Sequence, residues 1–110
     1  MTLNIYDLQD ISVRPVTKKT SVIARADILI GGLRIHGIRI QKSQFTHPRF
    51  QEKIQIEPPS IPTGPYWMKV VYFEDKELWQ AIEEKIYDEF RRLDLPYEPL
   101  MSVNPEEIPI

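Results

Sequence analysis

The chain has 110 residues, a formal net charge of −2 at pH 7 and no cysteine. This length is typical of one domain, and the lack of cysteine excludes disulfides, thiolate catalysis and cysteine-ligated zinc. No apolar run approaches the roughly 20 residues that a membrane-spanning helix needs, and the first ten residues lack the basic start and apolar core of a signal peptide. We therefore expect a cytoplasmic protein without a membrane partner.

The charge is unevenly distributed along the chain. Residues 1–53 carry a net charge of +5, whereas residues 54–110 carry −7. Such asymmetry is typical of proteins whose basic part binds nucleic acid or another anion. It is equally typical of two halves that attract each other, within one fold or across a dimer.

The first predicted elements are strands. Residues 11–16 (ISVRPV) predict a short strand, at a sheet edge or ending at Pro15, because proline lacks the amide hydrogen that a central strand donates. Residues 22–30 alternate apolar and polar side chains. After a Gly31-Gly32 turn, residues 33–41 complete an antiparallel hairpin.

The second hairpin strand needs a β-bulge. Strict alternation over residues 33–41 leaves both faces half apolar and half polar, which does not suit a half-buried strand. A bulge at His36-Gly37 shifts the alternation by one residue, and glycine suits the position because it has no Cβ atom. The bulge places Leu33, Ile35, Ile38 and Ile40 on one face and Arg34, His36, Arg39 and Gln41 on the other.

Residues 42–53 predict a polar loop, and residues 54–59 predict a short strand. The prolines and the glycine of residues 58–66 predict a rigidly kinked loop. The aromatic and β-branched side chains of residues 66–73 predict a well-buried strand.

Residues 75–93 predict a helix with Asp75 as its N-cap. Its apolar stripe recurs at spacings of three and four and comprises Leu78, Trp79, Ile82, Ile86, Phe90 and Leu93. Residues 94–110 hold four prolines without periodicity, so we expect an extended tail after one domain of residues 1–93. The predicted fold class is α+β: an antiparallel sheet with a bulged hairpin, followed by one long C-terminal helix packed on the sheet.

This ordered series of segments resembles the stage V sporulation protein G family of small bacterial regulators. The matching stretches are ISVRPV (11–16), IHGIRI (35–40), IQIEPPS (54–60) and ELWQAIEEKIYDEFRRL (77–93). Their order and spacing agree over roughly residues 10–93. The resemblance implies a homodimer that binds DNA or RNA in a regulatory role linked to sporulation and septation. It implies neither catalysis nor a cofactor.

Basic side chains on one sheet face and on a nearby loop are the candidate nucleic-acid contacts, because several together suit phosphate oxygens. They are Arg14, Lys18, Lys19, Arg25, Arg34, His36, Arg39 and Lys42. The alternative is a solvated sheet face on which Arg25 or Arg34 pairs with Asp27.

The two histidines, His36 and His47, lie far apart in the sequence and predict no metal site. We expect the His36 ring to be packed, with one nitrogen bonded to backbone, although a His36–Asp27 pair across the hairpin is conceivable. No serine or cysteine nucleophile stands in a recognisable motif. We therefore expect no enzyme, no cofactor and no small-molecule substrate.

The loop of residues 42–53 interleaves Phe45, His47, Arg49 and Phe50. Aromatic side chains in a long connection typically fill a satellite core or a dimer contact, and the alternative is stacking on single-stranded bases.

The second hypothesis for function is a homodimeric protein-interaction module that binds no nucleic acid. Exposed strand edges and a short core favour a homodimer, with the proline-rich loop and the tail as docking segments. Residues 58–67 carry no lysine or arginine, which favours this hypothesis over nucleic-acid binding.

Overall fold

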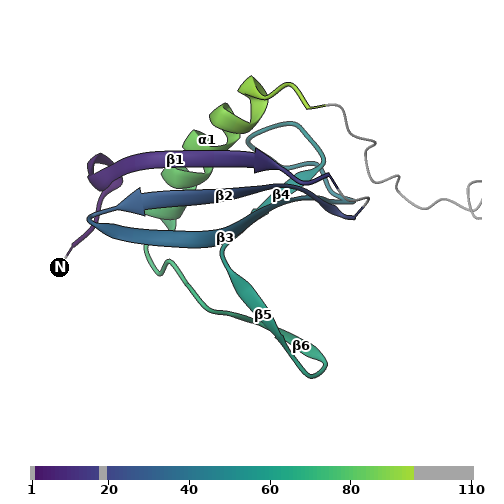
Figure 1. Ribbon diagram of the computed structural model, residues 1–110, viewed down its shortest axis with the longest axis horizontal. Helices are drawn as coiled ribbons and strands as arrows, with labels where there is room; N and C mark the ends of the chain where they lie inside the picture. The colour runs from purple at the N-terminus through teal and green to yellow at the C-terminus, as the bar shows by residue number, and fades with distance from the viewer. Residues whose placement is uncertain (1, 18–19, 96–110) are drawn as a thin grey trace, which may run out of the picture.

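The computed structural model describes residues 2–17 and 20–95 (Figure 1). Its elements in chain order are the 3-10 helix η1 (Ile5–Asp7), the strands β1 (Leu8–Pro15), β2 (Val22–Ile30), β3 (Leu33–Lys42), β4 (Ile54–Glu57), β5 (Ser60–Thr63) and β6 (Tyr66–Lys69), and the helix α1 (Lys76–Arg92). The strands β1 to β4 form one antiparallel sheet in the order β1-β2-β3-β4, and β5 and β6 form a separate two-stranded sheet.

The predicted α+β class is confirmed. The helix α1 lies along one face of the four-stranded sheet, and the β5–β6 hairpin projects away from both (Figure 1). Within the described part of the chain, no helix is long and apolar enough to cross a membrane. The predicted tail lies outside the described residues from residue 96 onward.

The edge strand β1 and the β2–β3 hairpin form as predicted. β1 is an edge strand and ends at Pro15, where the missing amide hydrogen removes no central ladder bond. Gly31 and Gly32 adopt φ angles of 57° and 79° in the turn between β2 and β3. Both angles lie in the left-handed region that glycine adopts without a Cβ penalty.

The predicted bulge in β3 is also confirmed. Asp27 of β2 stands alone opposite both His36 and Gly37, and the register shifts by one residue at this point. Gly37 has a φ of 85°, a backbone conformation that other residues rarely adopt.

The bulge brings three of the four predicted isoleucine and leucine positions of β3 into the core. Ile35, Ile38 and Ile40 are buried. Leu33 shares their face as predicted, since it is the register partner of the buried Ile30, but it is 55% exposed. Leu33 is the first residue after the Gly31-Gly32 turn, at the end of the sheet, where little chain is available to cover it.

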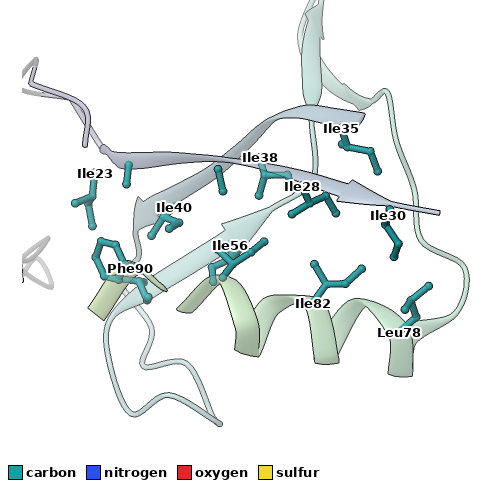
Figure 2. Close-up of a cluster of buried hydrophobic side chains, with 14 residues drawn as sticks. Ile23, Ile28, Ile30, Ile35, Ile38, Ile40, Ile56, Leu78, Ile82 and Phe90 are labelled. Carbon is teal, nitrogen blue, oxygen red and sulfur yellow. The ribbon is translucent and has the colours of Figure 1, made fainter. Parts of the chain in front are cut away.

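The core lies between the sheet and α1 (Figure 2). Asp75 caps the helix by accepting a hydrogen bond from the Leu78 amide at 3.1 Å. The buried face of α1 comprises Leu78, Ile82, Ile86 and Phe90, together with the acidic residue Glu83. Trp79 is partly buried and Leu93 is 37% exposed, so the apolar stripe weakens at the helix end.

The predictions for residues 58–73 are confirmed only in that a strand forms at residues 66–69, within the predicted 66–73. The kinked loop and the burial of that strand are wrong. The expected kinked loop and buried strand are instead an exposed hairpin, β5–β6, in which all of residues 61–70 are exposed. Gly64, with a φ of 66°, opens its two-residue turn. Both strands of a two-stranded sheet are edge strands, so Pro62 is tolerated in β5.

Candidate nucleic-acid interface

The sheet face that turns away from α1 carries a row of arginines. Arg14 of β1 is in register with Arg25 of β2, which is in register with Arg39 of β3. Neighbouring strands lie about 4.8 Å apart, so the three side chains leave the sheet side by side. Like charges directly opposite each other are destabilising, and a bound anion would relieve that repulsion. We call these three residues the arginine row.

The two outer arginines of the row have carboxylate partners. Arg14 Nη2 donates to Asp27 Oδ2 at 2.7 Å, and Arg39 Nη2 donates to Glu57 Oε2 at 3.0 Å and to Ser60 Oγ at 2.7 Å. Arg25, in the centre, is exposed and forms no ion pair with any other described residue. It therefore keeps an uncompensated positive charge on this face.

Asp27 is the buried carboxylate of the polar face. It is 8% exposed and lies between Arg14 and His36, whose Nδ1 is 3.1 Å from Asp27 Oδ1. The alternative in which Asp27 pairs with Arg25 or Arg34 is therefore wrong. Arg14 reaches Asp27 diagonally because Ser12, two residues away on β1, is the register partner of Asp27.

His36 does not have the predicted environment. Its side chain is 71% exposed and faces the Asp27 carboxylate instead of a backbone group. The predicted bulge places His36 on the polar face beside Asp27, so the alternative His36–Asp27 pair across the hairpin forms instead.

Arg34 completes the polar face at the hairpin end of β3. Its Nη1 lies 3.6 Å from Asp10 Oδ2, and both side chains are exposed. Among the described residues of this face, four arginines thus lie near the three carboxylates of Asp10, Asp27 and Glu57. The charge of the face is mostly balanced internally, with the surplus at Arg25.

The structure brings five of the eight predicted contact residues onto one face: Arg14, Arg25, Arg34, His36 and Arg39. Lys42 is in register with the buried residue Ile54, so it lies at the end of β3 on the side of the sheet that α1 covers. Lys18 and Lys19 lie outside the described residues.

The loop between β3 and β4 packs on the helix instead of forming a free aromatic surface. The His47 and Phe50 rings stack at 4.1 Å, and Phe50 stacks on Tyr87 of α1 at 4.1 Å. Because Phe50 is packed between these two rings, the satellite-core interpretation is right for Phe50, whereas Phe45 is 77% exposed. Burial and a hydrogen bond to Glu52 raise the pKa of Tyr87 to about 12.

A buried ion pair fixes the same loop to α1. Glu83 is 7% exposed and accepts a hydrogen bond from Arg49 Nη2 at 2.5 Å, with His47 Nε2 at 3.7 Å from its other oxygen. Burial raises the pKa of Glu83, and the Arg49 charge opposes that effect. This arrangement uses Arg49 structurally, which leaves it unsuited to binding a phosphate.

An aromatic residue that the sequence pattern did not predict, Trp67, lies next to the arginine row on an exposed aromatic hairpin. The Arg39 guanidinium carbon lies 4.9 Å from the centroid of the Trp67 ring in β6. Tyr66, Trp67 and Tyr72 are 75%, 63% and 61% exposed. The Gly64-Pro65 pair between two β-prone stretches was the available signal for this hairpin.

Comparisons with protein-family models, with curated proteins and with solved structures find no match. The resemblance to the stage V sporulation protein G family therefore stays a prediction.

Proposed function

We propose that the protein binds nucleic acid without catalysing a reaction, through contacts between phosphate oxygens and the arginine row. The observation that carries this proposal is Arg25, which is exposed and unpaired among the described residues between two further arginines in register. Arginine side chains bind phosphate oxygens in planar, bidentate geometry. A regulatory role and a cytoplasmic location accompany this proposal as predictions.

The charge balance of the face sets the strength of such binding. With three of the four arginines beside carboxylates, few phosphates are neutralised and few counterions are released. We therefore expect dissociation constants in the range of about 1–100 μM at physiological salt, as for non-specific binders, and a shallow dependence on salt.

Replacing Arg25 by Ala is expected to weaken binding and to reduce the slope of log K against log salt by about 1, because one phosphate contact is lost. Fluorescence anisotropy with labelled duplex DNA, single-stranded DNA and RNA across a salt series measures both quantities. The matched control is Arg92→Ala, which removes an exposed arginine at the far end of α1 that pairs with Glu89. Equal slopes for the wild type and Arg25→Ala, with the fold intact by circular dichroism, would contradict the proposal.

A homodimeric interaction module is the second candidate, and the open edge of β4 favours it. β4 is the last strand of the large sheet, and no described strand pairs with its outer side. A hollow of about 330 Å³ beside it is lined by Ile56 and Glu57 of β4 and by Trp79 and Glu83 of α1. Open edges of this kind pair readily with a second strand.

Light scattering after size-exclusion chromatography tests the dimer over a range of protein concentrations. Strand pairing between copies is expected to give twice the mass of the chain and a dimer fraction that rises with concentration. A mass equal to one chain at every concentration would contradict it.

A further inference from the structure

We propose that the β5–β6 hairpin and the segment up to Tyr72 form a stacking platform for unpaired bases, so that the nucleic acid bound is single-stranded. This inference rests on the proposed function and adds the class of ligand. The platform consists of the Trp67 ring, which packs on Arg39 of the arginine row, and the Tyr72 ring beside Lys69.

The first support is the exposure of the aromatic rings. Trp67 and Tyr72 are 63% and 61% exposed, on a hairpin that projects from the body (Figure 1). Tyr66 alternates with Trp67 along β6, so it points to the opposite face and is not part of the platform. Large aromatic rings left exposed to this extent are typical of a surface that meets a partner. An isolated two-stranded hairpin is also only marginally stable, so contact with a ligand would stabilise it.

The second support is the charge of the hairpin. Residues 58–73 contain no aspartate or glutamate, and their one charged residue is Lys69. The Lys69 ammonium lies 5.5 Å from the Tyr72 ring centroid. The whole chain has a net charge of −2, so a stretch that offers aromatic faces and a cation without a carboxylate of its own suits a phosphate backbone. Glu57 and Glu83 line the hollow that Lys69 and Tyr72 share, so the favourable side is that of Trp67.

The third support is Arg39, which joins the platform to the arginine row. Its guanidinium packs on the Trp67 ring at 4.9 Å and is held by hydrogen bonds to Glu57 and Ser60. The fixed guanidinium therefore orients the indole beside the row. Phosphates on the row and bases on the hairpin would then belong to successive nucleotides of one strand.

Duplex DNA does not satisfy both contacts. Its bases are paired and stacked on one another, so their faces are closed to side chains, whereas single strands present each base to an aromatic ring. Surfaces that bind single strands without sequence preference combine a basic track for the backbone with aromatic rings for the bases. The arginine row and the hairpin supply these two components.

The test compares Trp67→Ala with Trp67→Phe and Met68→Ala, in binding to oligo-dT and to a DNA duplex of equal length. Losing one stacked base lowers affinity by about 5- to 150-fold. We therefore expect Trp67→Ala to lower oligo-dT affinity within that range and to leave duplex affinity unchanged. Trp67→Phe keeps a ring and is expected to retain most of the affinity. Met68→Ala, which removes an exposed apolar side chain of β6 without a ring, is expected to have no effect.

Several outcomes would overturn the inference. Unchanged oligo-dT affinity in Trp67→Ala, while Arg25→Ala still weakens binding, would refute the stacking platform and leave the proposed function standing. An equal loss for oligo-dT and duplex, together with a dimer that dissociates in light scattering, would make the hairpin a contact between copies. Failure of the wild type to bind any nucleic acid at low salt would refute the proposed function itself, and this inference with it.

Discussion

Replacing Ile82 by Ala is expected to lower the free energy of unfolding by about 2–5 kcal/mol. Ile82 is fully buried, and its side chain points from the middle of α1 toward the isoleucines of the sheet (Figure 2). Its removal deletes apolar contacts and leaves a cavity between two layers that can close only partly. Since small domains are stable by about 5–15 kcal/mol, this single change removes a large share of the total.

Urea denaturation followed by circular dichroism measures this loss, with Ile61→Ala as the matched control. Ile61 lies in β5 and is 47% exposed, so the same chemical change is expected to alter the free energy of unfolding by less than about 0.5 kcal/mol. A similar loss in both variants would contradict a core that lies between α1 and the large sheet.

Local patterns were sufficient to predict the strands of the large sheet, the β2–β3 hairpin and the helix. The bulge followed from counting faces over residues 33–41, because only a shift at Gly37 puts the isoleucines together. The helix followed from one apolar stripe and the Asp75 cap. In these elements the periodicity of the sequence and the burial in the tertiary structure agree.

The β5–β6 hairpin was mispredicted because its composition conflicts with its position. Tyr66, Trp67 and Met68 are typical of a buried strand, yet all three are exposed. Whether an aromatic strand is buried or exposed depends on which other elements pack on it in the tertiary structure, and no local pattern encodes that packing. This disagreement between composition and burial is also what marks the hairpin as a candidate binding surface.

The candidate site was predictable in its residues but not in its ion pairs. Alternation and the bulge placed Arg25 and Arg39 on the polar face, but their lateral alignment with Arg14 depends on the register of three strands. The same register brings Arg14 and His36 to the Asp27 carboxylate. Register depends on turn geometry and bulges along the whole hairpin, so sequence spacing alone does not fix which charges meet.

Replacing Arg49 by Met is expected to destabilise the protein by about 2–4 kcal/mol at pH 7. The change leaves the Glu83 carboxylate, which is 7% exposed, without its closest cation. Breaking a fully buried pair in this way costs about 3–5 kcal/mol, and the estimate is lower here because the Arg49 side chain is 29% exposed. Arg92→Met, which breaks the exposed pair with Glu89, is the matched control and is expected to change stability by less than about 1 kcal/mol.

The penalty in Arg49→Met is expected to shrink as the pH falls from 7 to about 4. Burial already raises the pKa of Glu83 above its ordinary value of 4.5, and losing Arg49 removes the main opposing interaction. A carboxyl whose folded-state pKa is raised stabilises the fold below its unfolded-state pKa, and this contribution is lost as the pH rises through the folded-state value. The variant therefore loses more stability than the wild type over this window.

Denaturation of both proteins at pH 4, 5, 6 and 7 measures this difference, and the double variant Arg49→Met with Glu83→Gln identifies its source. If the unpaired charge is responsible, removing it recovers most of the stability at pH 7 and abolishes the added pH dependence. His47 Nε2, 3.7 Å from Glu83, also faces the carboxylate, so the series is repeated with His47→Gln. A pH-independent penalty that the double variant does not recover would assign the loss to other Arg49 contacts, such as its hydrogen bond to the Gln80 carbonyl.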